Sequence, residues 1–463
     1  MSTLLALVTS QEVEQALVRW LPEQRWFDGT GRALASAQVV RSHVFAAPAA
    51  PDGALGALVV VRARDVVGAD AGSYLLVVGA CQAQRRPGGE VIARQGGGVV
   101  YDALQDPLLI QCLLQLMADG QGRDGAVFSS EPPGFATPEK PMPVRALGAE
   151  QSNTSVTIGD QFILKIFRRV SPAPSPDLVV HRMLVDQDSA HVPPLLGAAW
   201  DEASGGTYAT VQEFLPKAQD GWAAALASVR RVLAPADARP AQDFAARARG
   251  LGGALASVHG DLARAAGQQQ LEARHYRQLS QLFLRRLTAA VDGAPQLAPY
   301  AGRLHEQFSA VARLAPSAHR SAQLSHGDLH LGQTLHTSEG WILLDFEGEP
   351  LADHTERSRH HSPLRDVAAM LRSFDYAAHH ELTGTVDCVQ ALGRAREWVE
   401  LSRRAFLDGY GAHRGEYTSG DQELLRAYEL DKAVYEVLYE TRHRPSWAWI
   451  PLRAIEQSIG VSV

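Results

Sequence analysis

The spacing of apolar residues changes along the chain and predicts where helices and strands lie. Between residues 9 and 21 apolar side chains recur at helical intervals, which predicts a short amphipathic helix that ends at Pro22. The segments 57–62 and 73–78 are instead rich in Val and Leu and are bounded by Gly and Asp, as strands are. A small β-rich domain is therefore expected over residues 1–90.

The middle of the chain has shorter elements. A Gly- and Arg-rich stretch, 85–98, reads as a connection, and residues 107–117 have helical spacing. Together with the Pro-rich segment that follows, they predict an intermediate piece over residues 91–143. Strand patterns at 157–167 and 208–215 then predict a mixed lobe over residues 144–216.

Nearly all of the chain beyond residue 224 has helical spacing, except for the segment 326–349. We therefore expect a mainly helical lobe over residues 217–463, joined to the mixed lobe. The predicted fold class is α+β.

Composition and charge remove several classes of function. A chain of 463 residues exceeds the size of one hydrophobic core. The net charge of −7 is spread along the sequence, and no run of Lys or Arg builds the basic surface that a nucleic-acid binder needs. The first residues lack the pattern of a signal peptide, and no apolar run approaches the length of a membrane span. We expect a cytoplasmic protein, a monomer, with no nucleic-acid or membrane partner.

The candidate chemistry lies in the non-helical interruption. It reads Ser-His-Gly-Asp-Leu-His-Leu-Gly-Gln over residues 325–333, and an apolar strand then ends in Asp-Phe-Glu at residues 345–347. Phosphoryl transfer needs a carboxylate beside the acceptor hydroxyl and oxygen ligands that hold Mg²⁺ against the nucleotide. Asp328 is the candidate catalytic residue, and Gln333 and Asp345 are the candidate metal ligands. A single acid in a loop is usually a surface turn residue, but this order and spacing together favour a kinase.

Lys165 is the candidate for pairing with ATP phosphates, because an ammonium among the apolar residues 162–167 needs a partner. The alternative is a lysine on an edge strand that points to water. The polar turn 148–155, which includes Ser152, would cover phosphates with N–H groups and hydroxyls, although its one glycine makes the signal weak. Arg365 and Asp366 are expected to form a pair that supports the catalytic loop.

At these residues the sequence resembles the actinobacterial maltokinase family, relatives of the aminoglycoside phosphotransferases. The likeness includes Gln-Arg-Trp at 24–26, the turn 148–155, Val-Gln-Glu-Phe-Leu-Pro at 211–216, the catalytic segment and Ser-Pro-Leu-Arg-Asp-Val at 362–367. The resemblance implies a bilobal eukaryotic-protein-kinase-like fold with an N-terminal cap. It also implies that ATP binds through backbone groups near Glu213 and Leu215.

The resemblance further implies that the segment 429–447 binds a small sugar, with His330 of the catalytic loop as another contact. Its candidate residues are Asp431, Lys432, Tyr435, Glu436 and Trp447. Four residues, including Lys432, Tyr435 and Glu436, recur at helical spacings of three and four and would share one face. The alternative is a solvated helix with ordinary Lys–Glu pairs.

Departures from the family bear on the substrate. The cap sequence at 27–32 diverges, Val179 stands where an acidic partner of Lys165 is expected, and Trp449 is an additional aromatic residue that favours a smaller pocket. The chain looks more like the glucosamine kinase relatives, whose substrate carries an ammonium that a carboxylate can bind. A maltokinase forming maltose 1-phosphate, an aminoglycoside phosphotransferase and a nucleotide-binding pseudokinase stay open as alternatives.

Overall fold

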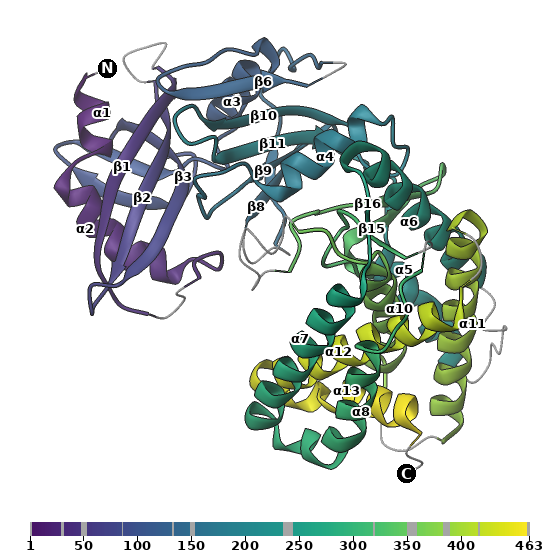
Figure 1. Cartoon of the computed structure of the whole chain (residues 1–463). Helices are drawn as coiled ribbons and strands as arrows, with labels where there is room; N and C mark the ends of the chain where they lie inside the picture. The colour runs from purple at the N-terminus through teal and green to yellow at the C-terminus, as the bar shows by residue number, and fades with distance from the viewer. Residues whose placement is uncertain are drawn as a thin grey trace. The chain divides into compact units, whose positions relative to one another are not determined.

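The computed structural model describes residues 2–28, 32–47, 53–85, 87–131, 134–148, 153–234, 244–317, 320–349, 359–382, 389–414 and 417–460. The chain divides into two compact units, Met1–Val179 with Pro193–Pro216, and Val180–Val192 with Lys217–Val463. The first holds two antiparallel sheets and the second is mainly helical (Figure 1). The predicted α+β class is confirmed. The finer division into residues 1–90, 91–143, 144–216 and 217–463 stays a prediction.

The N-terminal sheet has five strands in the order β1-β2-β3-β5-β4. Alternate residues of β2 pack on opposite faces: Val59 and Val61 lie in the core beneath the N-terminal helices, and Leu58 and Val60 lie in the core shared with the second sheet. Burial on both faces explains why the strand reads as one apolar run. The elements are α1 (Ser2–Val8), α2 (Gln11–Trp20), η1 (Leu21–Glu23), β1 (Leu34–Ala46), β2 (Leu55–Asp65), β3 (Asp70–Gln82), β4 (Val91–Gln95) and β5 (Gly98–Asp102).

The second sheet of this unit has six strands in the order β6-β10-β11-β9-β8-β7. Helix α3 packs between it and the first sheet through Leu109, Leu113 and Met117. The elements are α3 (Pro107–Asp119), β6 (Ala126–Ser130), β7 (Val144–Ala146), β8 (Thr154–Ile158), β9 (Phe162–Ile166), α4 (Pro176–Asp186), β10 (Leu195–Asp201) and β11 (Thr207–Glu213). Helix α4 continues into the second unit at residue 180.

The structure corrects the predicted elements in two places. The expected connection 85–98 contains β4, which pairs with β5. The single strand expected at 157–167 is instead the hairpin of β8 and β9, which turns at Gly159, where φ is 53°. The residues on both sides of this turn are apolar and the turn is short, so the sequence pattern of the two strands resembles that of one continuous strand. A glycine adopts this left-handed conformation without the clash that a Cβ introduces.

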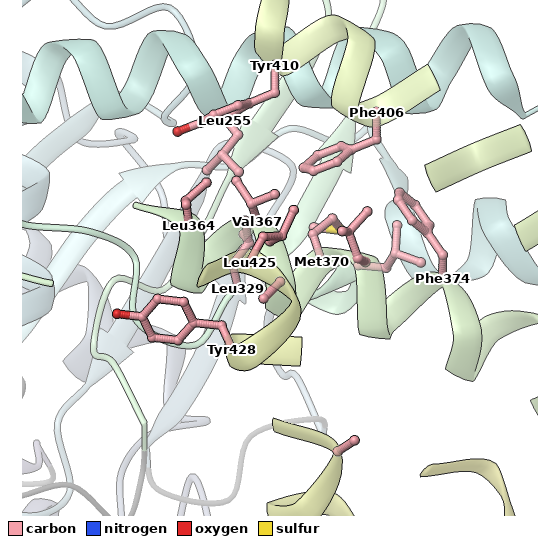
Figure 2. Close-up of a cluster of buried hydrophobic side chains, with 14 of the residues drawn as sticks. Leu255, Leu329, Leu364, Val367, Met370, Phe374, Phe406, Tyr410, Leu425 and Tyr428 are labelled. Atoms are coloured by element: carbon pink, nitrogen blue, oxygen red, sulfur yellow. The ribbon is translucent and has the colours of Figure 1, made fainter. Parts of the chain in front are cut away.

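Long helices build the second unit. They are α5 (Gly221–Leu233), α6 (Ala245–Ala266), α7 (Ala273–Gly293), α8 (Ala301–Val311), α10 (Leu364–His380), α11 (Val389–Arg414), α12 (Ser419–His443) and α13 (Trp449–Ile459), with the short helices η3 (Pro295–Tyr300) and η5 (Pro445–Trp447). Their apolar faces share one core, to which Leu329 from the loop after β14 also belongs (Figure 2). None of the described helices is long and apolar enough to cross a membrane.

Short strands frame the segment that interrupts the helices. Strand β15 (Thr334–His336) pairs with β12 (Gln219–Asp220) and β16 (Trp341–Leu343), and η4 (Leu331–Gln333) immediately precedes it. A separate ladder joins β13 (Gln269–Gln270) to β14 (Ser321–Ala322). The Leu343 N–H also donates to the carbonyl of His191, at 2.8 Å. The interruption expected at 326–349 is therefore a loop and a small sheet held on the helical core.

Candidate active site

The loop that carries Asp328 is anchored by alternate residues. Leu329 and Leu331 are buried in the helical core, whereas Asp328 and His330 are only partly buried. The Leu331 N–H donates to the Ser373 hydroxyl of α10 at 3.0 Å. Because apolar burial fixes every second residue, the polar residues between them are held in place for chemistry.

Asp366, in the first turn of α10, supports this loop from below. Its carboxylate accepts hydrogen bonds from the N–H groups of His326 at 2.7 Å and Gly327 at 2.9 Å, and from the Nε2 of His259 at 3.0 Å. Complete burial opposes ionisation, but these donors outweigh it and lower the pKa of Asp366 to about 2. The expected pair of Arg365 with Asp366 is wrong, because Arg365 binds Glu349 instead, at 3.0 Å.

Gly327 is the one loop position where the backbone requires glycine. Its φ is 85°, and a Cβ would lie 3.0 Å from the Cα of Gly348. The His-Gly-Asp order therefore has a steric cause: the loop must turn in a left-handed conformation while it passes close to the chain beyond Asp345.

The structure brings the two candidate metal ligands together. The Gln333 amide nitrogen donates to the Asp345 carboxylate at 2.9 Å, and the Leu344 N–H donates to the Gln333 carbonyl at 2.9 Å. Asp345 has a φ of 63°, a left-handed conformation that costs a non-glycine residue about 1–2 kcal/mol and is typical of functional sites. An amide and a carboxylate are donors that suit a hard cation, so this pair fits Mg²⁺.

Lys432 of α12 joins the loop that carries Asp328 to the helix predicted to bind sugar. Its ammonium lies 3.2 Å from Asp328 Oδ1 and 3.6 Å from Glu349 Oε1. Burial disfavours its charge, but the carboxylates of Asp328 and Glu349 prevail and raise the pKa of Lys432. Burial likewise opposes ionisation of Glu349, but Arg365, Lys432 and Arg286 lower its pKa to about 2. Asp328 thus stands at the end of a charged network.

Asp431, the neighbour of Lys432, faces helix α7. Its Oδ2 accepts from Arg286 Nη1 at 2.6 Å, while its Oδ1 is buried without a hydrogen-bond partner among the described residues. Burial raises the pKa of Asp431, opposed by Arg286. The carboxylate lies at a pocket within the helical unit that is lined by Leu279, Leu282, Phe283, Arg286, Gly327, Glu349, His361, Arg365, Ala369, Tyr428, Asp431 and Lys432.

Only some of the α12 residues that were predicted to share one face contact one another. The Lys432 ammonium lies over the Tyr435 ring, 5.4 Å from its centroid, and Tyr435 stacks on Tyr439 at 6.3 Å. Glu436 binds Arg372 of α10 through two hydrogen bonds of 3.0 and 2.7 Å. Since Arg372 is buried, this pair belongs to helix packing as well as to the candidate site.

Two further candidates have mainly local partners. The Trp447 ring lies 4.5 Å from the Arg444 guanidinium and 5.1 Å from the His380 ring. Within the described part of the chain, no hydrogen bond, ion pair or ring contact joins it to Asp328 or Lys432. The His330 Nδ1 accepts from the Gly332 N–H at 3.1 Å, and burial lowers the pKa of His330. His330 therefore shares the loop of Asp328, whereas Trp447 is not brought into contact with it.

In the first unit, Lys165 has an acidic partner that the sequence pattern did not identify. Its ammonium donates to Asp177 Oδ2 at 3.0 Å, and both side chains are buried. Strand β9 lies between β8 and β11, so the edge-strand alternative for Lys165 is wrong. The residue at the expected position, Val179, is 36% exposed. Asp177 precedes Val179 by two residues in the same helix. The acidic residue in the first turn of this helix was the sequence signal that could have identified the partner of Lys165.

The other ATP-binding candidates lie near the end of this unit. Glu213 ends β11, its N–H donates to the Pro194 carbonyl at 3.0 Å, and its side chain is exposed. Leu215 follows in the connection, where the neighbouring Phe214 N–H donates to Gln161 at 2.8 Å. Ser152 lies outside the described residues, as do residues 149–151 of the same turn.

We expect Asp177→Asn to raise the KM for ATP by about tenfold, because a buried ammonium that loses its carboxylate loses its position and its charge. Steady-state kinetics with varied ATP measure this. Val179→Ala is the matched control on the same helix and should leave the KM for ATP unchanged. Equal effects of both substitutions would contradict the pairing.

Sequence reasoning missed the residues that hold the site from other helices. Arg286 of α7 and Arg372 of α10 bind Asp431 and Glu436, respectively. Neither arginine is near its partner in sequence, and an arginine on a helix is ordinarily a surface residue. No local signal marks them, because their role depends on which helices pack together.

Two family models match the chain. The maltokinase N-terminal cap domain matches residues 20–106, and the phosphotransferase enzyme family matches residues 143–417. Two curated relatives are described as glucosamine kinases. The one from Mycolicibacterium smegmatis is 28% identical over 67% of this chain and 78% of its own length. The one from Streptacidiphilus jiangxiensis is 30% identical over 52% of this chain and 56% of its own length.

A solved structure has the same fold. It is a glucosamine kinase in complex with glucosamine, ADP and inorganic phosphate, which aligns over 96% of this chain and 98% of its own with a TM-score of 0.69 and 21% sequence identity. This likeness confirms the kinase-like fold, and the cap match agrees with the predicted maltokinase resemblance. Because the phosphotransferase model spans more than half of the residues, the chain belongs to the phosphotransferase enzyme family.

Proposed function

We propose that this protein is an ATP-dependent glucosamine kinase that forms glucosamine 6-phosphate. The observation that carries the proposal is the contact of Lys432 with Asp328, because it joins the catalytic loop to the helix predicted to bind sugar. The similarity to curated glucosamine kinases supports the substrate. ATP is the proposed donor.

Asp328 would orient the 6-hydroxyl of the sugar toward the γ-phosphorus of ATP. The new bond joins the sugar oxygen to phosphorus, the bond to the β–γ bridging oxygen breaks, ADP leaves, and Asp328 accepts the hydroxyl proton. Lys432 holds the Asp328 carboxylate at 3.2 Å, so the carboxylate does not need to reorient when substrate binds. Catalysis is then positioning combined with electrostatic stabilisation.

Gln333 and Asp345 would hold Mg²⁺, which offsets phosphate charge when it is bound. In the first unit, Lys165 would pair with the nucleotide phosphates, and backbone groups at Glu213 and Leu215 would bind ATP. The Lys165–Asp177 pair also removes the argument for a pseudokinase, which rested on Val179 alone. The monomeric state and the cytoplasmic location remain predictions.

The free oxygen of Asp431 supports an amino sugar as acceptor. A buried carboxylate oxygen without a donor is costly, and a substrate ammonium would satisfy it. Trp449 packs on His379 with ring centroids 5.4 Å apart, next to the segment expected to bind sugar. The match to a maltokinase cap domain favours a second candidate, a maltokinase that forms maltose 1-phosphate.

The test is ADP release from Mg-ATP with glucosamine, maltose, glucose, N-acetylglucosamine and kanamycin as acceptors. We expect the highest kcat/KM with glucosamine, and a phosphorus NMR spectrum of a 6-phosphate monoester. Preference for maltose with a product phosphorylated at the anomeric carbon would favour the maltokinase instead. Preference for kanamycin, or no product from any sugar, would overturn both candidates.

A further inference from the structure

Helix α7 reaches the candidate sugar site through Arg286. One arm of its guanidinium, Nη1, lies 2.6 Å from Asp431 Oδ2, and the other, Nη2, lies 3.9 Å from Glu349 Oε2. Glu349 lies beside Lys432, which binds Asp328. Arg286 therefore links Asp431 on α12 to the charged residues that lead through Glu349 and Lys432 to Asp328.

The pairing with Arg286 decides which oxygen of Asp431 is free. Oδ2 is engaged by the guanidinium, and Oδ1 is left buried without a donor among the described residues. Asp431 and Arg286 both line the pocket. A planar guanidinium holds a carboxylate in one orientation better than a flexible ammonium does. Asp431 is 6% exposed, so water cannot replace a lost partner readily.

The apolar part of the same helix explains why Arg286 stays at the pocket. Leu279, Leu282 and Phe283 lie one and two turns earlier on α7 and line the same pocket. Phe283 is buried against Tyr428 of α12, with ring centroids 5.5 Å apart. This packing fixes α7 against α12 and limits where the Arg286 side chain can reach.

We propose that Arg286 is a positioning residue that determines specificity for amino sugars: it holds the Asp431 carboxyl group so that Oδ1 faces the substrate ammonium. The inference rests on the proposed function. Arg286 acts through Asp431 and does not itself touch the reacting atoms. A neutral sugar offers only a hydroxyl at this position, which binds a carboxyl oxygen less strongly than an ammonium does.

A double-mutant cycle tests the proposal. The variants are Arg286→Met, Asp431→Asn and the two combined, with kcat and KM measured for glucosamine, glucose and ATP. Arg286→Met should raise the KM for glucosamine about tenfold and leave kcat and the KM for ATP within about twofold. In the Asp431→Asn background the same substitution should change the KM for glucosamine less than about twofold.

Two further variants separate positioning from folding. Arg286→Lys keeps a cation, so its KM for glucosamine should lie between those of the wild type and Arg286→Met. It replaces Arg286→Met in the cycle if Arg286→Met does not fold. Arg285→Met changes the neighbouring, exposed arginine of α7 and should behave as wild type. The positioning role would be overturned if the two substitutions had additive effects on the KM for glucosamine, or if Arg286→Met raised the KM equally for glucosamine, glucose and ATP. The kinase assignment would stand in either case. A wild-type protein inactive on glucosamine would overturn both.

Discussion

Asp328→Asn should lower kcat with glucosamine by about a thousandfold while changing the KM values only a few-fold. The substitution keeps the size of the side chain but removes the group that accepts the hydroxyl proton, and such groups contribute about 10²–10⁴ to the rate. It also removes the negative charge that Lys432 binds at 3.2 Å. ADP release under saturating Mg-ATP and glucosamine measures the effect.

The control for Asp328→Asn is Asp292→Asn, at an exposed position near the end of α7. It makes the same chemical change outside the site and should have no effect on kcat. A turnover of Asp328→Asn near that of the wild type would show that another group takes the proton. A large rise in the KM for glucosamine at constant kcat would assign Asp328 to binding rather than to the chemical step.

Asp366→Asn should reduce the free energy of unfolding by about 3–5 kcal/mol, because one partner of a buried, hydrogen-bonded network is lost. The amide NH₂ would replace an acceptor that serves the N–H groups of His326 and Gly327 and the ring of His259. The catalytic loop would also lose its support, so kcat should fall as well. Urea unfolding at pH 7 measures the stability, and the exposed Asp408→Asn should change it by less than about 0.5 kcal/mol.

The effect of Asp366→Asn should depend on pH in a set direction. The folded pKa of Asp366 is lowered to about 2, below the value of 3.8 for a free side chain, so ionisation of this group stabilises the fold above about pH 4. That contribution, about 2 kcal/mol, is lost as the pH falls toward 2. The difference in stability between wild type and variant should therefore shrink from pH 5 to pH 3. A constant difference would mean that the carboxylate charge does not matter.

The sequence by itself determined the class of fold and indicated a phosphotransferase. Periodicity separated a β-rich N-terminal part from a helical C-terminal part, because each element's burial is recorded in its own residues. Asp328, Gln333 and Asp345 became candidates because a phosphoryl-transfer loop needs these groups in one short segment.

Tertiary structure decided which oppositely charged side chains form pairs. Asp177 rather than a residue at position 179 binds Lys165, Glu349 rather than Asp366 binds Arg365, and Arg286 holds Asp431 across 145 residues of chain. Such pairs form only after apolar packing has brought the helices and strands together. From the sequence alone, an arginine that binds a buried acid cannot be distinguished from an arginine that faces water. The local pattern therefore predicted the candidate reacting groups, whereas packing decided which partners hold their charges.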